Sequence, residues 1–169
     1  VEPARAAPPA AVNAPVSGVG YLIPGHDDAA LRAAAALLQA GLRPRVAMKP
    51  VSLDGVEHPR GSLVVSVYDH RDRSPQDLHA QVRSALDGHA VSLVALRSGR
   101  GPGDAPDLGG GEFRLLDAPR LAILGKGATN SQNFGFLWYY AEQHLGLTPT
   151  LLDEAAIGRI DLRRYNVIL

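Results

Sequence analysis

The sequence predicts an α/β protein with a mainly parallel sheet and helices on both of its faces. Segments typical of strands alternate along the chain with segments typical of amphipathic helices. A helix followed by glycine and then by a strand also occurs three times, in LLQAGLRPRVAM, SALDGHAVSLVAL and EQHLGLTPTLLD. Strands joined through helices usually run in the same direction, so this repeated order favours parallel pairing.

The first part of the chain alternates strands with two helices. Short apolar runs predict strands at 19–23, 46–48, 63–68 and 90–96. The first helix begins at Asp27 or Asp28, either of which can cap it, and Gly41 follows its end. Ser74 and Pro75 supply the cap and the first residue of the second helix.

A long loop at 97–111, rich in glycine, proline and aspartate, precedes the second part of the chain. Beyond it, strands are predicted at 113–116, 121–124, 150–152 and 165–169. Asn130 or Ser131 caps a third helix, which Gly146 ends. We therefore expect an α/β lobe over 18–117 and a second α/β region over 118–169.

Both ends of the chain predict that it is one piece of a larger protein. Residues 1–17, VEPARAAPPAAVNAPVS, are dominated by proline and alanine and predict either a linker from an upstream domain or a disordered tail. The last residues, YNVIL, predict a strand that enters a core, which indicates truncation; the alternative is a short natural terminus paired at a sheet edge. A truncated sheet leaves an open edge, so we expect a homodimer or a swapped assembly of the isolated chain.

Composition narrows the function without identifying it. The 169 residues include 17 Lys and Arg against 17 Asp and Glu, and this balance argues against a nucleic-acid partner. There is no cysteine, which excludes disulfides, cysteine zinc sites and a cysteine nucleophile. No apolar run approaches the length of a membrane span, and no signal peptide opens the chain, so we expect no membrane partner.

Polar residues follow two of the predicted strands. His26, Asp27 and Asp28 come after the first strand, and Asp69 and His70 come after the strand at 63–68. If these strands are parallel neighbours, His26, Asp27, Asp69 and His70 converge and could bind a divalent metal that activates water. The other interpretation is that the aspartates cap helices and the histidines lie in solvated turns.

A third strand end carries a glycine-containing turn. Its candidate ligand-binding residues, which suit an anionic or phosphate-bearing small molecule, are Gly125, Lys126, Gly127, Asn130 and Ser131. The turn lacks both the third glycine of a dinucleotide fingerprint and a Walker A sequence. The alternative is a tight strand-to-helix turn in which Asn130 or Ser131 is the helix cap.

The third helix concentrates five of the nine aromatic residues of the chain. They are Phe134, Phe136, Trp138, Tyr139 and Tyr140. Around a helix some of them face the core and others face outward. They predict either core packing or a contact surface for another domain or subunit, because aromatic residues anchor interfaces.

Residues 119–169 resemble the opening half of a class I glutamine amidotransferase-like domain, which has a flavodoxin-like parallel sheet. The likeness rests on a strand, a glycine turn, a helix, a second strand and then DLRRYN at 161–166. With LLQAG at 37–41, PRGSLVV at 59–65 and DLGG at 107–110, the chain resembles the C-terminal region of bacterial M14-family zinc carboxypeptidase-like proteins.

The resemblance implies a parent protein that hydrolyses peptide bonds with zinc and is exported, either secreted or periplasmic. The family's zinc motif belongs to an upstream peptidase domain, and no residue here matches it; the amidotransferase cysteine would come after Leu169. We therefore expect no catalytic residue and no cofactor in this chain, and a non-catalytic accessory role beside that upstream catalytic domain. The alternatives are a free-standing metal-dependent hydrolase and a small-molecule binding module.

Overall fold

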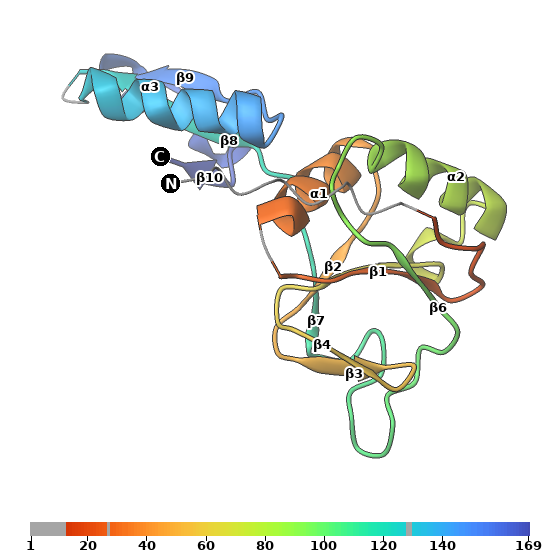
Figure 1. The fold of residues 1–169 in the computed structure, drawn as a ribbon. Coiled ribbons are helices and arrows are strands. Elements are labelled where there is room, and N and C mark those ends of the chain that lie inside the picture. Colours follow the sequence, from red (N-terminus) through yellow and green to blue (C-terminus); the bar gives the residue numbers. More distant parts are fainter. Residues whose placement is uncertain (1–12, 27, 128–129) are drawn as a thin grey trace, which may run out of the picture. The chain divides into compact units, whose positions relative to one another are not determined.

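The computed structural model describes residues 13–26, 28–127 and 130–169 (Figure 1). The chain divides into two units, Val1–Asp117 (unit 1) and Ala118–Leu169 (unit 2). Among the described residues, no helix has both the length and the apolar character needed to cross a membrane.

Unit 1 contains a five-stranded sheet, two helices and a separate hairpin. The sheet has the strand order β6-β1-β5-β2-β7, and every neighbouring pair is antiparallel. Its strands are β1 (Gly20–Ile23), β2 (Arg45–Ala47), β5 (Leu63–Ser66), β6 (Val94–Leu96) and β7 (Phe113–Leu115). The two helices are α1 (Asp28–Gln39) and α2 (Pro75–Ala85), and the 3-10 turn η1 (Tyr68–His70) lies between β5 and α2. The hairpin is formed by β3 (Val51–Leu53) and β4 (Val56–His58).

The prediction of a mainly parallel, flavodoxin-like or class I amidotransferase-like sheet is therefore wrong. The helix α1 does connect two strands that run in the same direction, β1 and β2, but β5 lies between them in the opposite direction. The helix α2 likewise connects β5 to β6, and β1 lies between them. Two interleaved crossovers of this kind form the split β-α-β arrangement known as ferredoxin-like, in which each helix passes over an antiparallel strand.

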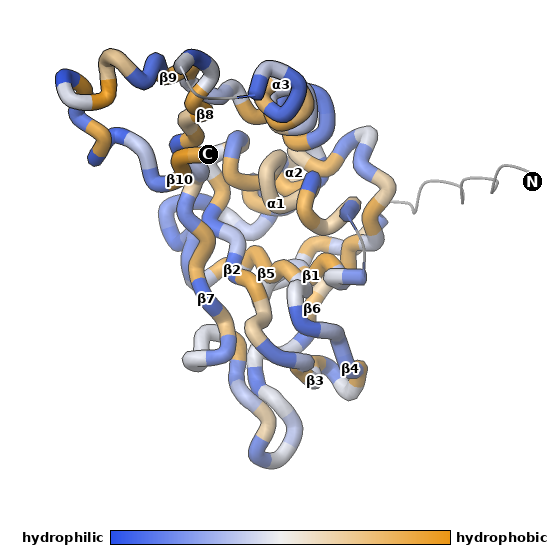
Figure 2. The backbone as a smooth tube through the Cα atoms, turned by 90° about the vertical axis from the view of Figure 1, so that its left-hand side faces the viewer, coloured by the Kyte–Doolittle hydropathy of each residue, from blue (hydrophilic) through white to orange (hydrophobic). Residues whose placement is uncertain are grey.

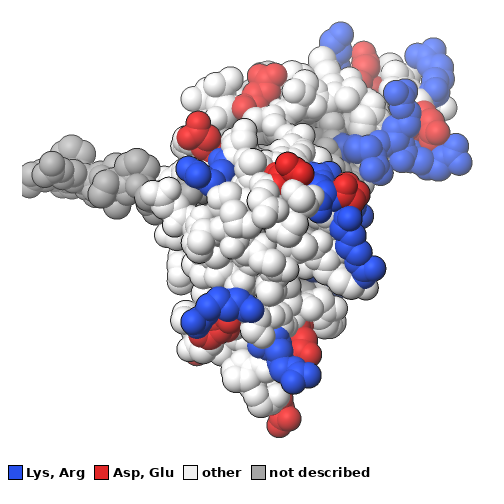
Figure 3. Space-filling model, turned by 90° about the vertical axis from the view of Figure 1, so that its right-hand side faces the viewer, with Lys and Arg blue, Asp and Glu red and all other residues white. Residues whose placement is uncertain are grey.

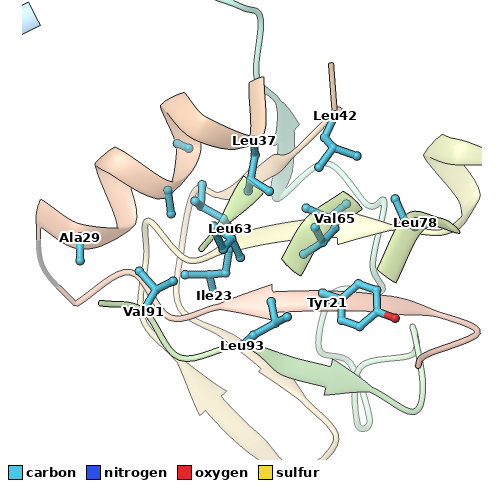
Figure 4. Packing of buried hydrophobic residues seen from close by; sticks show 14 residues of the cluster. Tyr21, Ile23, Ala29, Leu37, Leu42, Leu63, Val65, Leu78, Val91 and Leu93 are labelled. Carbon is cyan, nitrogen blue, oxygen red and sulfur yellow. The ribbon is translucent and has the colours of Figure 1, made fainter. Parts of the chain in front are cut away.

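The two faces of the large sheet are covered by different elements, which also corrects the prediction of helices on both faces. Tyr21, Ile23, Leu63 and Val65 belong to one cluster with the buried side chains of α1 and α2 (Figure 4). On the other face, Leu22 and Val64 belong to a second cluster, together with the hairpin residues Val51 and Leu53 and with Ala47, Leu96 and Phe113. The strands β1 and β5 are thus buried on both faces, and Figure 2 shows their apolar character.

Local signals fix the ends of the unit 1 elements. The Ser74 hydroxyl accepts a hydrogen bond of 3.1 Å from the Asp77 backbone N–H and caps α2, whose first residue is Pro75. Gly41 follows α1 with φ of 72°, a conformation that favours glycine. Asp54 and Gly55, with φ of 53° and 80°, form the turn of the β3–β4 hairpin.

Unit 2 has a small parallel sheet with the strand order β10-β8-β9. Its strands are β8 (Leu121–Lys126), β9 (Thr150–Asp153) and β10 (Val167–Ile168). Its helical elements are α3 (Ser131–Tyr139), the π-helical turn η2 (Tyr140–His144) and the 3-10 turns η3 (Glu154–Arg159) and η4 (Leu162–Arg164). Among the described residues, the parallel pairing predicted to dominate the sheet occurs only in unit 2, where α3 connects the adjacent strands β8 and β9.

The core of unit 2 is small. Its buried apolar cluster consists of Leu121, Ile123 and Ala141, with Phe134 and Trp138 packed partly buried against it. None of the described α3 side chains is buried, whereas α1 buries six. The aromatic helix of unit 2 therefore leaves much of its apolar surface in contact with solvent.

Candidate functional site

The antiparallel pairing of β1 and β5 separates the residues predicted to form a metal site. His26 follows the end of β1 and lies near the start of β5, where the Gly25 N–H donates to the Ser62 hydroxyl at 3.1 Å. Asp69 and His70 follow the end of β5, where the Val67 N–H donates to the Val19 carbonyl at the start of β1. The histidine near His26 is instead His58, whose pKa is lowered by burial and, to a smaller extent, by His26.

The predicted metal cluster is thus not assembled from His26, Asp69 and His70. Its fourth residue, Asp27, lies outside the described residues. Within the part of the chain that the structure describes, no group of three or more histidine and carboxylate side chains could hold a metal ion.

His70 is fully buried, and both of its ring nitrogens are hydrogen-bonded. Its Nε2 accepts a hydrogen bond of 2.9 Å from the Arg43 backbone N–H, so this nitrogen is unprotonated in the neutral ring. The Nδ1–H then donates to the Ser66 carbonyl at 2.8 Å. Burial is the main cause that lowers the pKa of the imidazole. His70 is therefore a neutral histidine that joins η1 to the chain before β2.

Asp69 is held by Arg45 in a two-bond ion pair. The Arg45 Nε donates to Oδ2 at 2.7 Å and Nη2 donates to Oδ1 at 2.8 Å. The hydrogen bond from Arg45 is the main cause that lowers the pKa of the Asp69 carboxyl. Both side chains are largely buried, with exposed fractions of 22% for Arg45 and 12% for Asp69, so water screens this pair less than a surface pair.

This ion pair borders a cleft at the carboxyl end of β5, the Tyr68 cleft. A hollow of about 250 Å³ is lined by Arg45, Ser66, Tyr68, Asp69, Leu108 and Gly109. A second hollow of about 460 Å³ is lined by Gly18, Val19, Ser66, Val67, Tyr68, Arg71, Gly99 and Leu108. The two share Ser66, Tyr68 and Leu108 and so form one cleft.

The glycine turn of unit 2 lies between β8 and α3. The Asn130 side-chain carbonyl accepts hydrogen bonds from the backbone N–H groups of Gln132 at 2.9 Å and Asn133 at 3.4 Å, so Asn130 is the helix cap. A side chain at Gly125 would collide with Leu151 and Phe134. Ser131 begins α3 and Lys126 is exposed, while residues 128–129 lie outside the described residues.

The other hollow of interest in unit 2 is an apolar groove beside α3, the α3 groove. It has a volume of about 380 Å³ and is lined by Phe134, Gly135, Trp138, Tyr139, Glu142 and Leu151. Phe136 and Tyr139 are the most exposed aromatic residues of the helix, with exposed fractions of 67% and 59%. Stacking between Phe136 and Tyr140, and between Tyr140 and His144, orders the exposed rings.

Sequence reasoning found Asp69 but missed the groups that surround it. Arg45 lies in a short strand, and nothing in the sequence indicates that it meets Asp69. Arg73 forms an ion pair with the adjacent Asp72 at 3.3 Å. Figure 3 shows such mixed basic and acidic side chains on the face that it draws. Arg71 instead lies 3.7 Å above the centre of the Tyr68 ring.

Comparison with known proteins adds no relative: no family model, no curated protein and no solved structure was found to match the chain.

Proposed function

We propose that this chain is a non-catalytic accessory region of an M14-family zinc carboxypeptidase-like protein, and that its α3 groove and the exposed rings beside it contact the catalytic domain. The observation that carries the proposal is an aromatic helix with no buried side chain. The identity of the partner comes from the resemblance of the sequence motifs to that family.

The exposed surface of α3 has the composition of a protein contact. Aromatic residues are enriched in interfaces and supply much of their binding energy when they fill a pocket on the partner. Phe136 and Tyr139 are exposed on α3, and Trp138 and Tyr139 line the α3 groove together with Leu151 of β9. Contiguous apolar surface of this kind is uncommon on monomers that have no binding partner.

The polar groups of unit 1 fit a structural role. His70 uses both ring nitrogens to hold backbone groups, and Asp69 is paired with Arg45. Such groups stabilise a fold and are not free to exchange protons with a substrate. In this proposal the peptide hydrolysis belongs to the catalytic domain, whose own residues hold the zinc.

The first test is to read the gene on both sides of this segment. The proposal expects an upstream reading frame that encodes the H-x-x-E zinc motif and a distant histidine. A frame without that motif would contradict the assignment to this family.

The second test expresses that catalytic domain separately and measures its affinity for this chain by calorimetry. The double substitution Phe136→Ser and Tyr139→Ser should weaken binding by about tenfold or more, because it removes two interface anchors. The matched control is Leu31→Ser, since Leu31 is an apolar α1 residue of unit 1 with 50% of its surface exposed. Absence of binding, or equal loss in the control, would overturn the proposal.

A further inference from the structure

The Tyr68 cleft of unit 1 has features of a site for an anion attached to an apolar group. Its larger hollow brings a guanidinium group, Arg71, next to an aromatic ring, Tyr68, and to the apolar side chains Val19 and Leu108. These residues come from three separate segments of the chain, which the antiparallel sheet brings to one end. Unit 1 alone supplies them, so nothing in this site depends on the proposed function of the chain.

The Arg71 guanidinium is positioned by stacking. It lies 3.7 Å from the centre of the Tyr68 ring, a distance typical of a cation–π contact. Among the described residues, no carboxylate forms an ion pair with it. Stacking fixes the plane of the guanidinium and leaves its N–H edges able to donate to an oxyanion, whose geometry matches this planar fork.

Ser66 adds a second donor. It lines both hollows, although only 5% of its surface is exposed. Its hydroxyl oxygen accepts a hydrogen bond of 3.1 Å from the Tyr68 backbone N–H. No acceptor for the hydroxyl proton is found in the part of the chain that the structure describes. A buried hydroxyl that accepts one bond and keeps its proton available is suited to donate to a ligand oxygen.

The charge and shape of the cleft favour the same ligand. Its lining contains two guanidinium groups and one carboxylate, and the carboxylate of Asp69 already accepts two hydrogen bonds from Arg45. One positive charge is therefore left without a partner. Three of the lining residues, Gly18, Gly99 and Gly109, have no side chain, so a ligand can approach the backbone closely.

We propose that the Tyr68 cleft binds a carboxylate that carries an apolar or aromatic substituent, with Arg71 and Ser66 donating to its oxygens and Tyr68 and Leu108 contacting the substituent. Two kinds of molecule carry such a carboxylate, namely a peptide with a free C-terminus and a small free acid. The two share the carboxylate and differ in the chain that precedes it.

The test is a titration of the full chain followed by NMR of its backbone amides. The probes are N-acetyl-phenylalanine, its amide, a hexapeptide that ends in phenylalanine and the C-terminal amide of that peptide. Both acids should shift the amides of residues 66–71, 99 and 108, and each amide probe should bind about tenfold more weakly, because it lacks the charge. Tighter binding of the hexapeptide identifies a peptide terminus as the ligand, and equal binding identifies a small acid.

Substitutions distinguish binding in the Tyr68 cleft from a general attraction of acids to positively charged side chains. Arg71→Gln should weaken binding of the acids about tenfold, and Ser66→Ala should weaken it about threefold. Arg83→Gln is the matched control, because Arg83 is an exposed arginine of α2 outside the cleft. The proposal is overturned if no acid binds at about 10 mM, if acids and amides bind equally, or if Arg83→Gln weakens binding as much as Arg71→Gln.

Discussion

Units 1 and 2 use the same order of elements, a strand, a helix and a second strand, and arrive at different sheets. In unit 2 the two strands joined by α3 are parallel neighbours. In unit 1 the strands joined by α1, and those joined by α2, are each separated by an antiparallel strand. The difference teaches that a helical crossover fixes the direction of the strand that follows it but not the place of that strand in the sheet.

The two units also differ in how many helix side chains they bury. The helix α1 buries six side chains, four of which belong to the cluster on the large sheet, and α2 buries Leu78 and Val82 in the same cluster. The helix α3 carries larger apolar residues and buries none of them. Unit 1 therefore buries one face of each helix against its own sheet, whereas α3 of unit 2 leaves an aromatic surface that a partner can cover.

The largest expected difference in the free energy of unfolding is between a buried leucine of α1 and a partly exposed leucine of α3. Leu37 of α1 is fully buried, and Leu37→Ala should lower the free energy of unfolding by about 2–5 kcal/mol through lost burial and a cavity. Leu137 of α3 is 36% exposed, and Leu137→Ala should cost about 1 kcal/mol or less. Urea unfolding followed by circular dichroism and by Trp138 fluorescence measures both; equal losses would remove the difference between the units.

His70 sharpens the comparison because its effect should be confined to unit 1. His70→Gln should lower the free energy of unfolding by about 2–3 kcal/mol, since it disturbs two buried hydrogen bonds. The folded pKa of His70 is depressed, so its stabilising contribution is present above the unfolded pKa of about 6.5 and is lost as pH falls through the folded pKa.

Urea titrations between pH 8 and pH 5 test this expectation, with the pH range set around the histidine pKa of about 6.5. The stability of His70→Gln should fall less steeply with decreasing pH than that of the parent chain. Some decline should remain, because the pKa of His58 is also lowered. His144→Gln, at an exposed residue of unit 2, is the control. An unchanged pH dependence in His70→Gln would contradict the neutral buried state.

A smaller contrast separates two arginine–aspartate pairs of similar geometry. Asp69→Asn should lower the free energy of unfolding by about 1–2 kcal/mol, because Arg45 is left largely buried without its charged partner. Asp161→Asn, in the exposed Arg163 pair of unit 2, should have no measurable effect. Asp69 has a depressed pKa when folded, so its contribution is present above its unfolded pKa of about 4 and is lost as pH falls through the folded value.

Equal effects of the two asparagine substitutions at neutral pH, measured by urea unfolding, would show that burial does not distinguish the pairs. A second readout is the acid side of the stability curve, where Asp69→Asn should flatten the decline below about pH 4.

The smallest effects concern the helix caps. Ser74→Ala and Asn130→Ala should each cost about 1 kcal/mol, because each removes an acceptor for the N–H groups at a helix start. Ser74→Ala should change the transition reported by circular dichroism, and Asn130→Ala the transition reported by Trp138. If both substitutions shift both transitions equally, the units do not unfold separately.

The elements of this chain could be predicted from its sequence better than their arrangement. The strands β1 and β5 stand out because they are continuous apolar runs, and such runs are typical of strands buried on both faces. In unit 1 the second face is covered by the β3–β4 hairpin, not by a helix. The Asp54-Gly55 turn signals that hairpin, but its strands of three residues are too short to be recognised as covering a sheet.

The candidate sites could not be predicted fully for the same reason, because they depend on how the strands are arranged. Whether His26 meets Asp69 depends only on the relative direction of β1 and β5, which local sequence does not encode. The Tyr68 cleft depends on contacts between residues far apart in sequence, such as Tyr68 and Leu108. The exposed face of α3 was one of two interpretations of its aromatic residues, and only burial distinguishes them.

The most direct test of the contact surface proposed for α3 is hydrogen–deuterium exchange of the chain alone and with the separately expressed catalytic domain. We expect added protection in residues 131–153, which contain α3 and β9, and none in unit 1. Protection confined to unit 1, or no added protection anywhere at saturating catalytic domain, would contradict the account.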